Sequence, residues 1–183
     1  MSYTYRKFQP TYDTLKPFDC GDADLNGFLV ETSSKAPNAT MYEKERLAVT
    51  YVVEDDESHL ILAYFSILHD KIERAFSDPA IWNRLSRHIP NAKRRSSYPA
   101  VKVGRLAVNH EAQGAGLGRE ILAFIKAWYY NQPKAGCRFI TVDALRSAEE
   151  FYSICHFHPL TNETSDDETI LMYYDLNSIP GTR

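Results

Sequence analysis

The sequence predicts an α/β fold of the α+β type: a mixed, mostly antiparallel central sheet of about seven strands with helices on both faces. Two observations predict it. About seven segments have the apolar pattern of strands, and those in the second half of the chain alternate with helical segments. In addition, a strand, a glycine-rich turn and an amphipathic helix follow one another from Val101 to Trp128, as in a crossover between parallel strands.

Length and composition favour one domain over residues 1–183. The chain has 183 residues, of which 44% are hydrophobic and 13% aromatic, enough for an ordered core. Its net charge of -3 provides no global electrostatic basis for binding nucleic acid. One basic run, Lys93-Arg94-Arg95, is more typical of a solvated loop than of a binding patch.

Several features predict a cytoplasmic protein without membrane or metal association. The first ten residues contain no apolar segment of the kind found in signal peptides. The longest apolar run, Leu60–Leu68, is far shorter than the roughly 20 residues of a membrane span. The 3 cysteines show no CxxC spacing, so neither a disulfide framework nor a zinc site is expected.

The first 68 residues contain three expected strands and one helix. Tyr3–Phe8 is the first strand, and Asp22 is expected to cap a helix from about Ala23 to Ser34. Arg46–Val53 alternates apolar and polar residues with the period of a strand. A charged turn at residues 54–58 then connects it to Leu60–Leu68, so these two strands form a hairpin.

A second helix is expected after Asp78, which is a suitable N-cap before Pro79 at the first helical position. It ends near Ile89, and Asn91–Ser97 is expected to be an exposed loop. Trp82, Leu85 and Ile89 form an apolar stripe at helical spacing, for which packing over the sheet is the simplest interpretation. A substrate lid or a homodimer contact is the alternative.

The second half supplies the remaining elements. Val101–Val108 is a strand, and the helix after the glycine turn has an apolar face of Ile121, Ile125, Trp128 and Tyr129. Further on, Ser147 and Glu150 match a capping box that would open a helix to about Cys155. The other expected strands are Arg138–Ala144, Phe157–Leu160 and Thr169–Leu176.

The turn Gln113-Gly114-Ala115-Gly116-Leu117-Gly118 places small residues where a helix begins. Amides in the first turn of a helix lack intrahelical partners, and the helix dipole adds positive potential there, so a phosphate group can bind. The pattern is neither a P-loop nor a dinucleotide fingerprint. It therefore predicts a different phosphorylated cofactor, with Arg119 either contacting a phosphate or simply solvated.

Two motifs resemble those of the GCN5-related N-acetyltransferases. Gln113-x-x-Gly116-x-Gly118 after a strand resembles the acetyl-CoA signature of that family, and Phe151–Phe157 resembles its FYxxxGF helix end, with His156 at the usual glycine. If that glycine's backbone freedom is needed, the turn here must differ. The order of elements extends the resemblance over nearly the whole chain.

The resemblance implies acetyl-CoA as co-substrate, with its pyrophosphate on the turn amides and its pantetheine arm along the preceding strand. It also implies that Tyr152 is the general acid that protonates the leaving thiolate. The implied cofactor-binding residues are Leu106, Ala107, Val108, Gln113, Gly114, Ala115, Gly116, Leu117, Gly118 and Arg119.

Direct acetyl transfer requires a deprotonated amine, a polarised thioester carbonyl and a proton donor for the leaving thiolate. A phenol, with a pKa near 10, can donate that last proton, although Tyr152 also fits a core aromatic position. The Val108 amide is our candidate for polarising the carbonyl. The general base is open: His69, Glu73 and Asp143 each follow or end a strand, but a structural role is simpler for each, and water can serve instead.

A narrower resemblance concerns the toxins that acetylate aminoacyl-tRNA. It rests on Phe18–Gly21, on Leu25–Leu29, on the strand that contains Tyr51 and on Gly104–Val108. The main expectation is an acetyl-CoA-dependent N-acetyltransferase whose primary-amine acceptor is a small molecule, a peptide or aminoacyl-tRNA. The alternatives are a tRNA-acetylating toxin with an antitoxin partner and a catalytically inactive CoA-binding module. His156 and His158, expected on one strand face, are too few to indicate a metal site.

Overall fold

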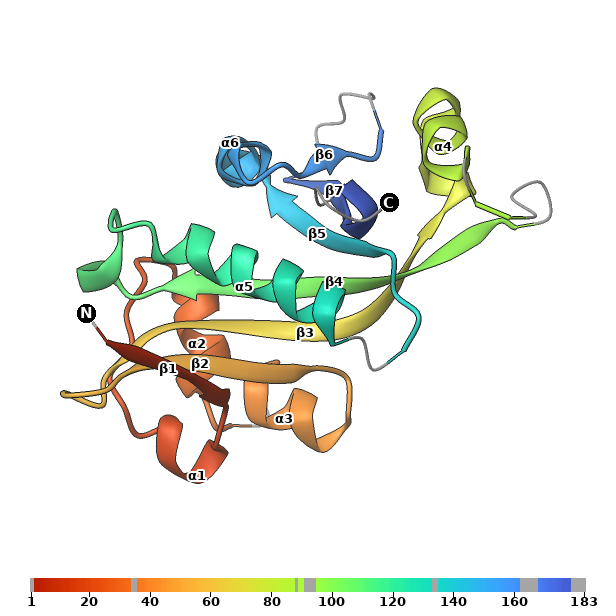
Figure 1. Cartoon of the computed structure of the whole chain (residues 1–183). Coiled ribbons are helices and arrows are strands. Elements are labelled where there is room, and N and C mark those ends of the chain that lie inside the picture. The colour runs from red at the N-terminus through yellow and green to blue at the C-terminus, as the bar shows by residue number, and fades with distance from the viewer. Residues whose placement is uncertain are drawn as a thin grey trace. The chain divides into compact units, whose positions relative to one another are not determined.

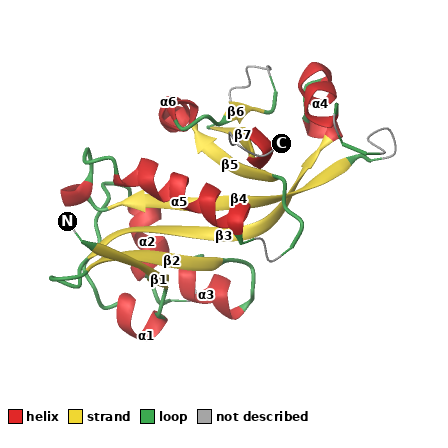
Figure 2. Ribbon diagram, viewed as in Figure 1, coloured by secondary structure: helices red, strands yellow, loops and turns green. Residues whose placement is uncertain are grey.

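The computed structural model describes residues 2–33, 36–87, 89–90, 95–132, 135–161 and 168–178. Within these ranges the strands form a seven-stranded sheet in the order β1-β2-β3-β4-β5-β7-β6 (Figures 1 and 2). Strands β4 and β5 are parallel, whereas β1–β2, β2–β3, β5–β7 and β6–β7 pair antiparallel. The predicted mixed, mostly antiparallel sheet is therefore confirmed. The strands are β1 Tyr3–Lys7, β2 Val49–Asp55, β3 Ile61–Glu73, β4 Ser97–Val108, β5 Phe139–Leu145, β6 His158–Pro159 and β7 Thr169–Asp175.

The helices connect these strands in sequence. They are α1 Pro10–Asp13, α2 Ala23–Val30, α3 Ala39–Lys44, α4 Pro79–Ser86, α5 Leu117–Asn131 and α6 Glu149–Ile154. In the part of the chain that is described, every helix is too short or too polar to span a bilayer.

The chain divides into two compact units. The first consists of Met1–Leu68 and Val103–Ala123, and the second of His69–Lys102 and Phe124–Arg183. Strands β3 and β4 and helix α5 each contribute residues to both units.

The first unit has helices on both faces of its strands, as predicted. On one face, Phe28 of α2 packs with Val52, Tyr64 and Ala107 in a common core. Successive side chains of a strand point to opposite faces of the sheet, so the residues adjacent in sequence to these core residues lie on the other face. On that other face the Tyr3 hydroxyl of β1 donates a hydrogen bond to a carboxylate of α5, that of Glu120. Figure 1 shows α2 and α5 on opposite sides of β3.

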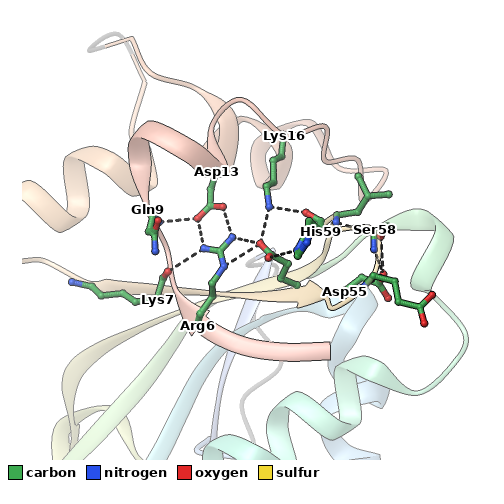
Figure 3. Close-up of polar contacts among 11 residues, drawn as sticks. Arg6, Lys7, Gln9, Asp13, Lys16, Asp55, Ser58 and His59 are labelled. Carbon is green, nitrogen blue, oxygen red and sulfur yellow. Dashed lines mark hydrogen bonds and ion pairs between the residues drawn. The ribbon is translucent and has the colours of Figure 1, made fainter. Parts of the chain in front are cut away.

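A charged network fixes the segment that follows β1 (Figure 3). The Arg6 guanidinium donates to both carboxylate oxygens of Asp13, at 2.8 and 2.6 Å, and also to Glu54. Lys16 donates to the same Glu54 carboxylate at 2.7 Å and to the His59 carbonyl at 2.6 Å. The His59 imidazole also lies against Glu54, with its Nδ1 3.1 Å from a carboxylate oxygen. Although burial opposes the shift, Lys16, Arg6 and His59 together lower the pKa of Glu54 to about 2. The network thereby ties α1 and the loop after it to β1 and β2.

Arg6→Met is expected to destabilise the protein by about 3 kcal/mol, because it leaves a buried carboxylate without its charged partner. The Asp13 side chain is 0% exposed, so water cannot replace the guanidinium. Urea denaturation measures the change. Lys71→Met is a matched control, since Lys71 is 58% exposed in its ion pair with Glu73 and such surface pairs contribute about 0–1 kcal/mol. Equal losses in the two variants would contradict the prediction.

The core of the second unit is built around α4. Trp82 is 3% exposed and stacks on Tyr98 of β4 with ring centroids 4.9 Å apart. Leu85 is buried in the same core, and Ile89 packs against it. The predicted apolar stripe therefore packs on the strands of its own unit, which is the simpler of the two interpretations. The Asp78 cap is confirmed, because its carboxylate accepts from the Ala80 amide at 2.8 Å.

Several predicted boundaries were wrong. Helix α2 ends at Val30 rather than at Ser34, and β3 and β4 extend beyond the apolar runs that predicted them. Helices α1 and α3 have only four and six residues, too few for an apolar period to show. The capping box at Ser147 was also wrong: α6 begins at Glu149 after an Ala148 N-cap that makes no side-chain hydrogen bond. Residues 91–94 of the expected basic loop lie outside the described residues.

Candidate active site

The glycine turn connects β4 to α5 through a short 3-10 turn at His110–Ala112. Gly114 and Gly116 have φ angles of +78° and +89°, a backbone region that is unfavourable for residues with a Cβ atom. A Cβ at either position would meet no atom within 4 Å. The glycines are thus required for the backbone conformation, while the outer surface of the turn, including Ala115, remains exposed.

Helical hydrogen bonding begins just after this turn. The amides of Arg119 and Glu120 donate to the Gly116 carbonyl at 3.0 and 3.2 Å, and the buried Leu117 side chain anchors the first turn of α5. The backbone amides just before them have no intrahelical acceptor, as is usual at a helix N-terminus, and can donate to a bound group. The turn has the geometry expected of an anion-binding helix N-terminus, and the Arg119 side chain is exposed beside it.

The side chain of Gln113 has a structural task that the sequence did not predict. Its amide nitrogen donates to the carbonyls of Cys20 and Val108, both at 2.9 Å. The His110 amide also donates to the Asp19 carbonyl at 2.7 Å. The loop before α2 therefore supports the glycine turn through these hydrogen bonds. For contact with a cofactor, Gln113 has only its backbone and the remaining part of its side-chain amide group.

The end of β4 presents its residues alternately. Ala107 is buried in the core of the first unit, whereas Leu106 and Val108 are half-buried on the other face. The Asn109 amide donates to the Leu62 carbonyl at 2.8 Å, which continues the pairing with β3 past the end of the strand. A pantetheine arm along this strand would meet the half-buried Leu106 and Val108 side chains, with Ala107 turned away.

Tyr152 lies on α6, in the second unit. Its half-buried ring makes edge contacts with Phe151 and Phe157, at centroid distances of 5.1 and 5.7 Å. Burial raises the pKa of Tyr152 to about 12, and the nearby Cys155 adds to the shift. The phenol is therefore protonated at neutral pH, as a general acid must be. Among the described residues its hydroxyl has no hydrogen-bond partner.

The end of α6 forms a Schellman motif around His156. The Phe157 amide donates to the Tyr152 carbonyl at 3.0 Å, and the His156 amide donates to the Ser153 carbonyl at 2.9 Å. His156 has a φ of +63°, the left-handed conformation that glycine favours. The left-handed conformation is therefore present without glycine, because histidine adopts it here. His156 also lies in this turn rather than on a strand face with His158.

His156→Gly is expected to stabilise the protein by about 0.5–1 kcal/mol. The substitution relieves a left-handed cost of about 1–2 kcal/mol, of which the greater freedom of unfolded glycine offsets about 0.5–1 kcal/mol. A thermal denaturation series with His156→Ala as control separates the backbone effect from loss of the imidazole. A lower Tm for the glycine variant than for the alanine variant would contradict the prediction.

The three candidate bases lie in the second unit. Asp143 accepts from Lys102 at 2.7 Å, and Glu73 pairs with Lys71 at 2.9 Å. His69 is exposed on β3. The ion pairs favour the structural interpretation for both carboxylates. Across the described ranges, no group of three or more histidine, cysteine or acidic side chains could hold a metal ion.

Sequence reasoning missed Lys126, on α5. Its ammonium donates to the Cys155 carbonyl at the end of α6 and lies 3.9 Å from the centre of the Tyr174 ring. The only signal was a lysine beside the apolar face of the helix, next to Ile125 and four residues after Leu122, both of which are buried.

Comparison with known proteins identifies the family of the domain and its fold. Residues 88–177 match the model of the acetyltransferase (GNAT) domain. A tyrosine-to-phenylalanine mutant of KacT superposes with a TM-score of 0.75 and 24% identity, covering 97% of each chain. AtaT in complex with acetyl-methionyl-tRNAfMet gives 0.75 and 23%, again with 97% of each chain.

AtaTR bound with acetyl-CoA gives a TM-score of 0.72 at 22% identity and covers 96% of this chain and 95% of that one. These similarities show that this chain shares its fold with at least 95% of each of these three neighbours. Together with the domain match, they confirm the family predicted from the glycine turn and the FYxxxGF-like helix end. The chain carries a GNAT acetyltransferase domain.

Proposed function

We propose that this acetyltransferase moves an acetyl group from acetyl-CoA to the amino group of aminoacyl-tRNA, as a toxin does. The main support is the similarity of fold, over 97% of both chains, to AtaT in its complex with acetyl-methionyl-tRNAfMet. The motifs Phe18–Gly21 and Gly104–Val108, which resemble those of tRNA-acetylating toxins, agree with it. We prefer this acceptor to the broader class of primary amines for that reason.

The glycine turn fits a CoA pyrophosphate. Gly114 and Gly116 leave the turn open, and the helix start provides unpaired amides and a positive dipole. The end of β4 would bind the pantetheine arm through the backbone around Val108. Acetyl-CoA supplies the acetyl thioester, and the cofactor-binding residues are those predicted from the sequence.

Tyr152 would act as the general acid. In the transfer, the amine nitrogen bonds to the acetyl carbon, the carbon–sulfur bond breaks, and the thiolate takes the phenolic proton of Tyr152. The raised pKa keeps this proton in place at neutral pH. The Val108 amide would donate a hydrogen bond to the carbonyl oxygen, where negative charge develops. The amine gives up its own proton to water.

An antitoxin is the partner expected of such a toxin. AtaT has been solved with the C-terminus of the antitoxin AtaR, and KacTA in a complex with DNA. We infer by analogy that a small antitoxin protein binds this chain and restrains it.

Radiolabelled acetyl-CoA and total charged tRNA test the proposal directly. We expect label on charged tRNA and none on tRNA whose amino acids have been removed beforehand. Induction of the chain in a bacterial host should also arrest growth. Label on polyamines, amino sugars or peptide N-termini but not on tRNA would establish a different amine acceptor. A thermal shift with acetyl-CoA and no transfer to any amine would identify a catalytically inactive CoA-binding module.

A further inference from the structure

Helix α6 is short and only partly buried. It has six residues, Glu149–Ile154, and none of them is fully buried. Its Ala148 N-cap makes no side-chain hydrogen bond. A helix this short is marginal by itself and depends on tertiary contacts for a fixed orientation. Contacts at its C-terminal end therefore help to fix the direction in which the Tyr152 phenol points.

Lys126 holds that end. Its ammonium donates to the carbonyl of Cys155, the C-cap residue of α6. A cation is favourable at this position, because the carbonyls at a helix C-terminus carry partial negative charge. Cys155 itself is 8% exposed, so the bond lies largely away from water.

The same ammonium lies close to two aromatic rings. It is 3.9 Å from the centre of the Tyr174 ring on β7 and 4.9 Å from that of Phe157. The Phe157 ring contacts Tyr152 and Tyr174, both at a centroid distance of 5.7 Å. A cation over aromatic faces is stabilised by their quadrupoles, and more so when it is partly desolvated. Lys126, Phe157 and Tyr152 thus form one continuous chain of contacts.

We infer that Lys126 is a positioning residue for Tyr152, which fixes the phenol by holding the Cys155 carbonyl and the Phe157 ring. The inference rests on the proposed role of Tyr152 in acetyl transfer. Small displacements of a catalytic group reduce rates strongly, by about 100-fold for a shift of about 1 Å.

Lys126→Met, which keeps the length of the side chain but removes the ammonium, tests the inference. With acetyl-CoA and charged tRNA, we expect kcat to fall by about 10- to 100-fold, with the Kd for acetyl-CoA within about twofold of wild type. Lys126→Arg should restore most of the rate, because it keeps a donor and a positive charge. Lys71→Met, at an exposed lysine of the same unit, should match the wild type.

The double variant Lys126→Met/Tyr152→Phe isolates the route of the effect. If Lys126 acts through Tyr152, the double variant should be no slower than Tyr152→Phe alone, since coupled residues are not additive. Multiplied losses would overturn the inference, and so would a wild-type rate for Lys126→Met. A wild-type rate for Tyr152→Phe would instead show that the proposed acid role of Tyr152 is wrong. The rate of Tyr152→Phe thus distinguishes a failure of the proposed function from a failure of the inference about Lys126.

A second measurement does not depend on the acceptor. In protein labelled with 13C at the tyrosine ring, the Tyr152 resonance is assigned by its loss in Tyr152→Phe. We expect Lys126→Met to shift this resonance and Lys71→Met to leave it unchanged. An unshifted resonance in Lys126→Met would overturn the inference even if no tRNA were acetylated.

Discussion

Tyr152→Phe is expected to lower kcat by about 10²- to 10³-fold, within the range of 10² to 10⁴ typical of general acid catalysis. The KM for acetyl-CoA should change by less than about twofold, because the phenylalanine ring keeps the contacts with Phe151 and Phe157. The physical reason is specific to the leaving group: without the phenolic proton, the CoA thiolate departs unprotonated. Steady-state kinetics with charged tRNA and varied acetyl-CoA measure both parameters.

The pH dependence provides an independent check of the same role. A general acid is active while it holds its proton, so the activity attributable to Tyr152 is lost as the pH rises through its pKa. Because burial raises that pKa to about 12, the loss lies above the ordinary tyrosine value of about 10. Tyr130→Phe, at an exposed tyrosine on α5, is the matched control. An unchanged kcat in Tyr152→Phe would remove the phenol from the mechanism.

Local signals predicted much of the fold. The N-caps at Asp22 and Asp78 are confirmed, since their carboxylates accept from amides two or three residues later. Such a cap can be predicted from the sequence because it involves only a few adjacent residues. The glycine turn is predictable for the same reason, since positive φ at Gly114 and Gly116 is a local requirement of the backbone.

The missed features depend on residues far apart in the sequence. The polar ends of β3 and β4 show no strand pattern, and Asp70 of β3 is satisfied by the Thr141 hydroxyl of β5, 71 residues away. Gln113 fits a cofactor motif, yet its side chain holds the carbonyl of Cys20, 93 residues away. No local pattern marks such partners, because only the tertiary fold brings them together.

Ala115→Glu is expected to weaken acetyl-CoA binding roughly fivefold to several hundredfold. Two like charges about 4 Å apart repel by about 1 kcal/mol in bulk water and by about 4 kcal/mol near a protein surface. Ala115 is suitable for this test because it is exposed in the turn and, unlike Gly114 and Gly116, has no positive φ. A new side chain there adds charge without straining the backbone. Isothermal titration with CoA, repeated at several salt concentrations, measures the change.

Ala115→Gln is the matched control, since it has nearly the same shape and no charge. If phosphates bind the turn amides, the glutamine variant should retain most of the affinity for CoA. Added salt should reduce the difference in affinity between the two variants, because it screens exposed charges. Equal losses in both variants would indicate that side-chain bulk, not charge, disturbs the site. Full affinity in Ala115→Glu would place the phosphates away from this turn, and the assignment of Gly114, Gly116 and Arg119 to the cofactor would then fail with it.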